Sequence, residues 1–430
     1  MVVSGFRVGN GVGFLCRNSC FHTGTTLPRG SFLAKKFIIL RGNRFSMKES
    51  FNPNYPDISY LRQKAESKIP RFAFEYLDRG CNNEINLKRN TEDIREVLLR
   101  PYYLQGRTTE KLDTTLFGKT YSAPFGVAPI GLQGMMWPGA SEILAKAAFD
   151  HNIPFILSTV ATASLETISE ITEGRAWFQL YNPVEDDVRN DILTRLEKAG
   201  YEVLVLLCDT PTFGYRSKEI RNGLAIPPKM TLRNIIQIAG RPHWALSTLF
   251  HGQPKFKTLT PYIPRNMNLQ HLGLFMNKTF SGKLDDDKIK KIRDRWKGKL
   301  VLKGVATPED AAKAIALGVD GIIVSNHGGR QLDQGQSSLA AMQSILKEYK
   351  DKIVTMMDSG VRNGPDIANT LACGADFVFL GRSFMYGVAA LGKTGGHHTI
   401  QLLKRQLQQI LEQLSCPTPA QLEKHLVKVR

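Results

Sequence analysis

The sequence has no apolar run long enough to cross a membrane. A membrane-spanning helix needs about 18–20 consecutive apolar residues, and a run such as Phe37–Leu40 is far too short. The sequence therefore predicts a protein that is not integral to a membrane. With 430 residues, of which 42% are hydrophobic, the chain can bury the core of one large α/β barrel or of two ordinary domains.

Cysteine is scarce and scattered. Of the six cysteines only Cys16 and Cys20 lie close together, and no second pair or histidine cluster completes a zinc spacing. The pattern favours free thiols in a reducing compartment, and we expect no metal site.

Acidic residues are nearly missing from the first 48 residues. Residues 1–50 contain eight basic side chains and one acid, Glu49, and the whole chain has a net charge of +18. A basic segment rich in Arg, Ser and Gly is typical of a mitochondrial transit peptide; a disordered basic tail is the alternative. There is no secretory apolar core and no peroxisomal ending, so we expect a mitochondrial location, or otherwise a cytoplasmic or peripheral membrane one.

Eight apolar runs of strand length are present, and most are followed by an amphipathic stretch. The runs are Ala123–Ile130, Pro154–Thr159, Ala176–Tyr181, Glu202–Asp209, Leu300–Val305, Gly321–Asn326, Ile353–Ser359 and Phe377–Arg382. This alternation predicts a (β/α)₈ TIM barrel. A doubly wound open sheet is disfavoured because no Gly-x-Gly-x-x-Gly opens the helix after the first strand.

We expect additional segments before and after the barrel in the sequence. Residues 57–78 predict two helices separated near Pro70, which form an N-terminal helical extension. We place the barrel domain at residues 54–416 and a C-terminal tail at 417–430.

A long insertion follows the fourth strand, since the fourth and fifth runs start 98 residues apart. Residues 217–283 contain ten basic residues, one acid (Glu219) and several apolar clusters. Such a mixture suits contact with a membrane surface; a lid or an arm for subunit contact is an equal alternative.

Polar and charged residues follow almost every strand. Barrel active sites are built at the carboxyl ends of the strands, and there the sequence has Ser158, Gln179, Tyr181, Asp209, Arg216, Lys303, Asp358, Arg362 and Arg382. The glycine-rich loop with Arg362 and the pair Gly381–Arg382 are suited to holding a phosphate.

The loop Ser325–Asp333 after the sixth strand is the most specific motif. His327 can abstract a proton near neutral pH, and Arg330 offers a planar fork of donors for a carboxylate. The string Ser-Asn-His-Gly-Gly-Arg-Gln-Leu-Asp resembles the active-site signature of the FMN-dependent α-hydroxy acid oxidases and dehydrogenases (glycolate oxidase, lactate dehydrogenase, mandelate dehydrogenase). The resemblance covers roughly residues 54–416.

The resemblance implies FMN as cofactor and an L-2-hydroxy acid, similar to lactate or mandelate, as substrate. It implies that His327 is the general base and that Asp209 stabilises its charged form. Tyr76, Tyr181, Arg216 and Arg330 would hold the substrate. The flavin would be held by Pro129, Ile130, Gly131, Ser158, Gln179, Lys303, Ser325, Asp358, Ser359, Gly360, Arg362, Gly381 and Arg382. The family also suggests a homo-tetramer, with oxygen, a quinone or a cytochrome as electron acceptor.

The sequence departs from the family pattern at several positions. Ile130 and Leu207 stand where threonines are common, and Ser359 stands where the oxidases often have glycine. Val160 takes the place of a bulky tryptophan of the glycolate oxidases, which leaves room for a substrate larger than glycolate.

Two other functions remain open from the residues alone. One is another phosphate-binding barrel enzyme, which would need a nucleophile such as Cys208 beside Asp209. The other is a basic binding protein without activity, for which nucleic acid is a conceivable partner. We expect no nucleic acid partner, because a binding protein leaves the polar strand ends unexplained.

Overall fold

The structure is a computed structural model that describes residues 51–106, 108–109, 111–223, 231–264, 279–280 and 283–427. Contacts divide the chain into Met1–Ser46 and Met47–Arg430. The proposed targeting segment 1–48 lies outside the described residues, and everything below concerns the second unit.

Eight parallel strands form the predicted barrel. They are β3 (Phe125–Val127), β4 (Ile156–Ser158), β5 (Trp177–Leu180), β6 (Val203–Leu207), β7 (Lys299–Val305), β8 (Gly321–Val324), β9 (Val354–Met357) and β10 (Phe377–Leu380). Their order in the sheet is β3-β10-β9-β8-β7-β6-β5-β4, and a parallel bridge between Val127 and Phe155 joins the two ends. The (β/α)₈ TIM barrel is confirmed. Each of the eight predicted runs corresponds to one strand, and β7 begins one residue before its run, at Lys299.

The barrel interior follows from the alternation of side chains along each strand. In β6, Val203 and Val205 belong to the small inner cluster, while Leu204 and Leu206 pack in the outer cluster with the helices. Both faces of the barrel sheet are apolar, because the helices cover its outer face.

A short hairpin that the sequence analysis missed closes the amino-terminal end of the barrel. Strands β1 (Thr114–Leu116) and β2 (Lys119–Tyr121) pair antiparallel. They are joined by Phe117 and Gly118, which both have positive φ, as a two-residue hairpin turn requires. The ring of Phe117 lies 5.8 Å from that of Trp177, at the start of β5.

Helices precede and surround the barrel. Before it come α1 (Ile58–Lys68), α2 (Arg71–Asp78), α3 (Ile85–Arg95) and the short η2 (Tyr103–Gln105). Around it lie α4 (Gln133–Met136), α5 (Ala140–Asp150), α6 (Leu165–Thr172), α7 (Asp186–Lys198), α12 (Asp286–Arg295), α13 (Pro308–Ala316), α14 (Ser338–Tyr349), α15 (Gly364–Ala372) and α16 (Arg382–Leu391). The break predicted at Pro70 is confirmed. Side-chain caps such as Thr307, which accepts from the backbone N–H of Asp310, fix several helix starts.

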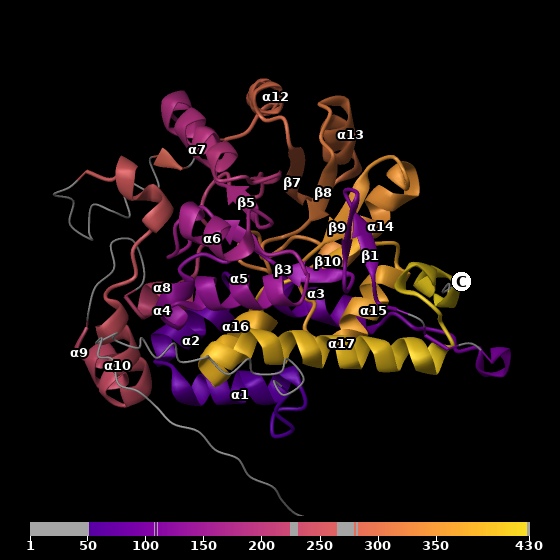
Figure 1. Cartoon of the computed structure of the whole chain (residues 1–430), viewed down its shortest axis with the longest axis horizontal. Helices are drawn as coiled ribbons and strands as arrows, with labels where there is room; N and C mark the ends of the chain where they lie inside the picture. Colours follow the sequence, from indigo (N-terminus) through magenta and orange to yellow (C-terminus); the bar gives the residue numbers. More distant parts are fainter. Residues whose placement is uncertain are drawn as a thin grey trace, which may run out of the picture. The chain divides into compact units, whose positions relative to one another are not determined.

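The insertion between β6 and β7 contains α8 (Ser217–Arg221), α9 (Leu232–Ala239), α10 (Pro242–His251) and η3 (Lys257–Tyr262). In Figure 1, α9 and α10 lie on the same side of the barrel as α2, α4 and α8. Trp244 of α10 donates from Nε1 to the carbonyl oxygens of Met135 and Met136, at 3.2 and 3.0 Å. This part of the insertion therefore packs on the barrel.

The chain ends in η4 (Gly392–Thr394), the long α17 (Gly395–Leu414) and η5 (Pro419–His425). Figure 1 shows α17 running beside α1 and α16. The backbone N–H of Arg100 donates to the carbonyl of His425 at 2.7 Å, and Leu99 bridges to Leu426. Residues of the predicted C-terminal tail, 417–430, therefore pack against the rest of the domain as far as Leu426.

Candidate active site

A cavity of about 1040 Å³ opens at the carboxyl ends of the strands. Most residues that the sequence predicted for the site line it. These are Tyr76, Pro129, Ile130, Gly131, Ser158, Gln179, Tyr181, Arg216, Lys303, His327, Arg330, Asp358, Ser359, Arg362, Gly381 and Arg382. The fold thus brings together side chains from all eight strand ends and from α2.

Three predicted residues lie behind the wall of the cavity. Asp209 contacts His327, and the hydroxyl of Ser325 accepts from Lys303 Nζ at 2.8 Å and from the backbone N–H of His327 at 3.1 Å. Gly360 has a positive φ, and a side chain there would collide with the backbone of Asn90. Ser325 and Gly360 therefore support the wall of the cavity.

His327 and Asp209 form a buried pair. Nδ1 of His327 lies 3.1 Å from Oδ1 and 3.3 Å from Oδ2 of Asp209, so Nδ1 carries a proton and Nε2 is left as the basic nitrogen. Burial lowers the pKa of His327, and the opposing charge of Asp209 only partly offsets this. Burial acts to raise the pKa of Asp209, but the facing imidazole outweighs it, and that pKa is lowered. The pair holds a neutral imidazole beside a carboxylate.

The backbone of the His327 loop is held in an unusual conformation. His327, Gly328 and Gly329 have φ values of 59°, 69° and 71°, a region that residues other than glycine rarely adopt. A Cβ on Gly328 would lie 2.6 Å from Nη1 of Arg382, and one on Gly329 would lie 2.6 Å from the backbone of Leu87. These close approaches require glycine at both positions. The left-handed backbone of His327 is strained, and strained residues of this kind cluster at functional sites.

Two arginines that the sequence predicts to hold the substrate carboxylate, Arg216 and Arg330, meet in the structure, and we call the pair the clamp. Glu219, which the sequence analysis did not assign to the site, lies against both. Arg330 donates from Nη2 to Oε1 of Glu219 at 2.7 Å, and Arg216 Nη1 lies 3.5 Å from Oε2 of the same side chain. The guanidinium of Arg330 also lies 4.9 Å from the centroid of the Tyr76 ring. Glu219 is the one acid among the ten basic residues of the insertion, and this was the signal that could have identified it.

Lys303 is a buried cation with two partners. Its Nζ lies 3.0 Å from Oδ2 of Asp358 and donates to Ser325. Burial opposes its charge, but the carboxylates of Asp358 and Asp209 outweigh burial and raise the pKa of Lys303. The lysine stays protonated at neutral pH.

The guanidinium of Arg382 is buried and has three carbonyl partners. It donates to Leu77 at 3.0 Å, Gly328 at 3.0 Å and Arg79 at 3.1 Å. Burial and then the nearby charge of Arg362 lower the pKa of Arg382 to about 9. Two guanidinium groups that disfavour each other's charge make a favourable place for an anion.

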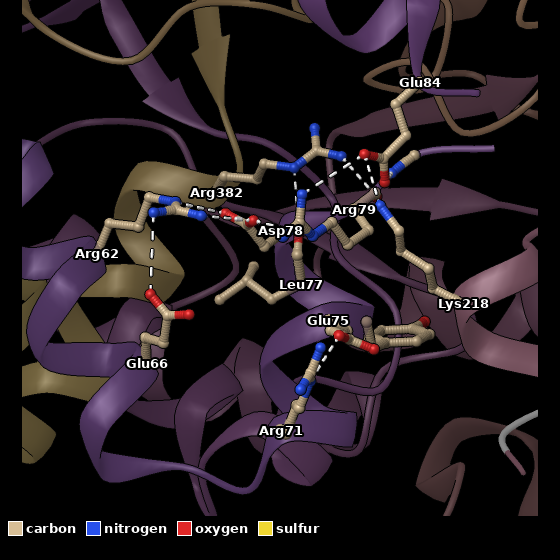
Figure 2. A network of polar contacts seen from close by, with 12 residues as sticks. Arg62, Glu66, Arg71, Glu75, Leu77, Asp78, Arg79, Glu84, Lys218 and Arg382 are labelled. Carbon is tan, nitrogen blue, oxygen red and sulfur yellow. Dashed lines mark hydrogen bonds and ion pairs between the residues drawn. The ribbon is translucent and has the colours of Figure 1, made fainter. Parts of the chain in front are cut away.

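Ion pairs join α2 and the loop after it to neighbouring helices (Figure 2). Asp78 accepts from Arg62 of α1 at 2.7 Å. Lys218 of α8 lies 2.7 Å from Glu84, and Arg221 of α8 lies 3.6 Å from Glu75. The helix that follows Arg216 is therefore tied to the helix that carries Tyr76.

Comparison with known proteins shows the family of this chain. The family model for FMN-dependent dehydrogenase matches residues 65–429. The chain belongs to this family. The fold resembles a monotopic membrane protein, (S)-mandelate dehydrogenase, with 31% identity, a TM-score of 0.83 and coverage of 87% of this chain and 100% of the other.

Two further solved structures resemble this FMN-dependent dehydrogenase. A soluble mutant of the membrane-associated (S)-mandelate dehydrogenase from Pseudomonas putida is 31% identical, with a TM-score of 0.73 and coverage of 87% and 100%. A mandelate oxidase is 26% identical, with a TM-score of 0.73 and coverage of 87% and 98%. The protein is an FMN-dependent oxidoreductase of the 2-hydroxy acid oxidase and dehydrogenase family.

The residues of the cavity fit the cofactor of this family. The side-chain Nε2 of Gln179 is buried and has no hydrogen-bond partner among the described residues. The Oε1 of the same side chain accepts from the hydroxyl of Ser158 at 3.0 Å. An unpartnered donor facing a cavity is costly unless a ligand satisfies it, and a flavin carbonyl can do so. Lys303 would supply a cation for the ring, and Arg362 and Arg382 would supply positive charge for the phosphate.

Other readings of the site find no support. Cys208, the candidate nucleophile, has its pKa raised by burial and by Asp209, which disfavours a thiolate. Among the described residues no three His, Cys, Asp or Glu side chains are arranged to hold a metal ion, and no helix there is long and apolar enough to cross a membrane.

Ile130, Leu207 and Val160, which depart from the family pattern, all line the cavity.

Proposed function

We propose that the protein oxidises an L-2-hydroxy acid, similar to lactate or mandelate, to the 2-oxo acid. The observation that carries the proposal is the His327–Asp209 pair, of which the imidazole lines the same cavity as Arg216 and Arg330. The solved mandelate dehydrogenase and mandelate oxidase structures support this substrate class.

In the proposed reaction the substrate carboxylate binds between Arg216 and Arg330, with the hydroxyls of Tyr76 and Tyr181 beside it. Burial raises the pKa of both tyrosines, so their hydroxyls remain donors. Nε2 of His327 takes up a proton as the hydroxy acid is oxidised, and Asp209 stabilises the imidazolium. Bound FMN supplies the acceptor for the two electrons. Pro129, Ile130, Gly131, Ser158, Gln179 and Lys303 would hold its ring, and Asp358, Ser359, Arg362, Gly381 and Arg382 its ribityl phosphate.

The exposed side of the insertion supports a peripheral membrane contact. Leu232, Ile235, Ile236, Leu246, Leu249 and Phe250 are all more than half exposed, and the sequence of the insertion is basic, with Arg233 in α9 and Arg241 at the start of α10. We propose that this face binds an anionic lipid surface, that electrons pass to oxygen, a quinone or a cytochrome, and that the protein is a mitochondrial homo-tetramer.

The spectrum of the purified protein tests the function. We expect a yellow protein that releases FMN on denaturation and whose flavin absorbance bleaches when L-lactate or L-mandelate is added without oxygen. His327→Gln should retain FMN and still bind a 2-oxo acid, but bleach roughly 10²–10⁴-fold more slowly, the usual contribution of a general base. Near-normal bleaching in this variant would exclude His327 as the base, and a protein that does not bind FMN would overturn the function.

A further inference from the structure

The cavity extends past the carboxylate clamp into an apolar chamber that the reaction above does not use. We call this the side chamber and define it by Phe72, Met135, Ile238, Trp244, Ala245 and Phe256, which line the same cavity. None of these six side chains is charged. A total volume of about 1040 Å³ is at the top of the range of roughly 300–1,000 Å³ for small-molecule sites, so the cavity has space for a sizeable apolar group besides the cofactor.

The wall of the side chamber is fixed by specific contacts. Trp244 is buried, donates to the two carbonyls of α4, and its ring meets Phe72 edge-on at 5.9 Å and 86°. The backbone N–H of Phe72 donates to Oε1 of Gln237 at 3.1 Å, and Arg241 Nε donates to the carbonyl of Ile69 at 3.3 Å. These bonds hold α9 and α10 on α2 and α4, so the chamber has a defined shape.

One face of α2 leads from the clamp to the side chamber. Tyr76 lies against the Arg330 guanidinium, and Phe72 is four residues earlier on the same helix, one turn or about 6 Å away. Val160 also lines the cavity, and a Cβ at Gly131 would lie 2.8 Å from its Cγ2. A ligand whose carboxylate is held at Arg330 would therefore direct its other end along α2 into the chamber.

We propose that the side chamber binds the apolar chain of the substrate, and that the preferred substrates are 2-hydroxy acids with a medium or long unbranched chain. The proposal rests on the proposed oxidation of 2-hydroxy acids and adds the part of the molecule that decides specificity. Thr248 of α10 also lines the cavity, and its buried hydroxyl has no hydrogen-bond partner among the described residues. The six side chains that define the chamber offer an apolar chain dispersion contacts, and the hydroxyl of Thr248 is a polar group in the same cavity.

A chain-length series tests the proposal. The second-order rate of anaerobic flavin bleaching is measured with L-lactate and the L-2-hydroxy acids of four, six and eight carbons. Burying one methylene should raise this rate about fourfold, until the chamber is full. The Kd values of the matching 2-oxo acids, measured by calorimetry on the holoprotein, should fall in parallel.

Two matched variants of α10 locate the effect. Ala245→Phe fills the side chamber and should lower the ratio of the eight-carbon to the lactate rate by at least tenfold. His243 is exposed on the same helix and does not line the cavity, so His243→Phe adds the same ring outside the chamber and should leave the ratio unchanged.

The possible outcomes separate this proposal from the function itself. Bleaching by L-lactate without any gain for longer chains would overturn the side-chamber proposal and leave the proposed function intact. If Ala245→Phe slows only reoxidation by an added quinone, the chamber serves the electron acceptor and the proposal is wrong. Failure of every 2-hydroxy acid to bleach an FMN-loaded protein would overturn both.

Discussion

Glu219 accepts a hydrogen bond from Nη2 of Arg330 at 2.7 Å, and both side chains are only 12% exposed. The same carboxylate faces Arg216, so an internal anion lies between the two cations that are expected to bind the substrate carboxylate. The cluster of two guanidinium groups and one carboxylate has a net charge of +1, which matches one further carboxylate.

The first prediction concerns this internal anion. Glu219→Gln keeps an oxygen acceptor for Arg330 but removes a negative charge from the clamp, so a 2-oxo acid should bind roughly fivefold more tightly, or about 1 kcal/mol. The free energy of unfolding should fall, because two buried cations lose their counter-charge. Titration calorimetry and urea unfolding measure the two effects. An unchanged Kd would show that Glu219 does not compete with the ligand.

The second prediction separates proton transfer from substrate binding. Asp209→Asn should slow flavin bleaching nearly as much as His327→Gln, because a neutral amide stabilises the imidazolium less, while the Kd of a 2-oxo acid changes little. Arg330→Lys keeps the charge but loses the planar fork, so both the Kd and the bleaching rate should suffer. Anaerobic stopped-flow absorbance and calorimetry distinguish the two patterns. If Asp209→Asn weakens binding as strongly as Arg330→Lys, the roles assigned to the residues are wrong.

The third prediction concerns the phosphate of FMN. Arg362 donates from Nη1 only to its neighbour Val361 at 3.0 Å, so Arg362→Gln removes a charge near Arg382 without breaking a long-range contact. We expect FMN to bind more weakly by about 1.5–3 kcal/mol, the usual value of a charge-assisted hydrogen bond. Arg382→Ala should also lose FMN, but it removes the donor to the carbonyls of Leu77 and Gly328 and one of two donors to the carbonyl of Arg79.

Fluorescence titration of the apoprotein with FMN measures this loss. Arg175→Gln, at an exposed arginine paired with Glu173, is the control and should bind FMN as the unchanged protein does. Equal affinity in Arg362→Gln and the control would remove Arg362 from the phosphate site.

The fourth prediction concerns the exposed apolar face of α9 and α10. Leu246 and Phe250 are 54% and 84% exposed, and replacing both by serine should weaken binding to anionic liposomes at least tenfold, since each apolar side chain contributes about 1.5–3 kcal/mol when buried. Salt should weaken the remaining binding, because exposed charges are screened within about 8 Å at physiological ionic strength.

A control for this prediction is Leu104→Ser, which removes a fully exposed leucine from η2. Liposome flotation then compares the two variants. Undiminished flotation of the α10 variant would assign the insertion to a lid or a subunit contact.

The fifth prediction concerns stability in acid. Burial, then the neighbouring His397 and Lys404, lowers the pKa of His151 from 6.5 to about 4, against a small opposing effect of Asp150. The unfolded chain takes up this proton near pH 6.5 and the folded chain only near pH 4. The contribution of neutral His151 to the free energy of unfolding is therefore fully present above pH 6.5 and is lost as the pH falls toward 4.

Urea unfolding between pH 7 and pH 4 tests the assignment. His151→Phe keeps a ring 5.3 Å from that of His397 but cannot titrate, so its stability should fall less across this interval. An identical decline in both proteins would show that other groups cause the loss.

The sequence by itself determined the barrel, the positions of its eight strands and a set of site residues most of which line the cavity. It could do so because a buried parallel strand is an apolar run of fixed length, and because the functional residues of a barrel follow the strand ends directly. His327, Gly328, Gly329 and Arg330 lie within four consecutive positions, so their shared loop was visible without any structure.

Only the tertiary structure decided which distant residues meet. Glu219 pairs with Arg330 across 111 positions, and the side chamber forms where α10 packs on α2 and α4. The hairpin of β1 and β2 was missed because two three-residue strands carry too short a pattern to recognise. Contacts of this kind depend on how helices dock on the barrel, and a spacing within the chain does not encode that docking in a readable form.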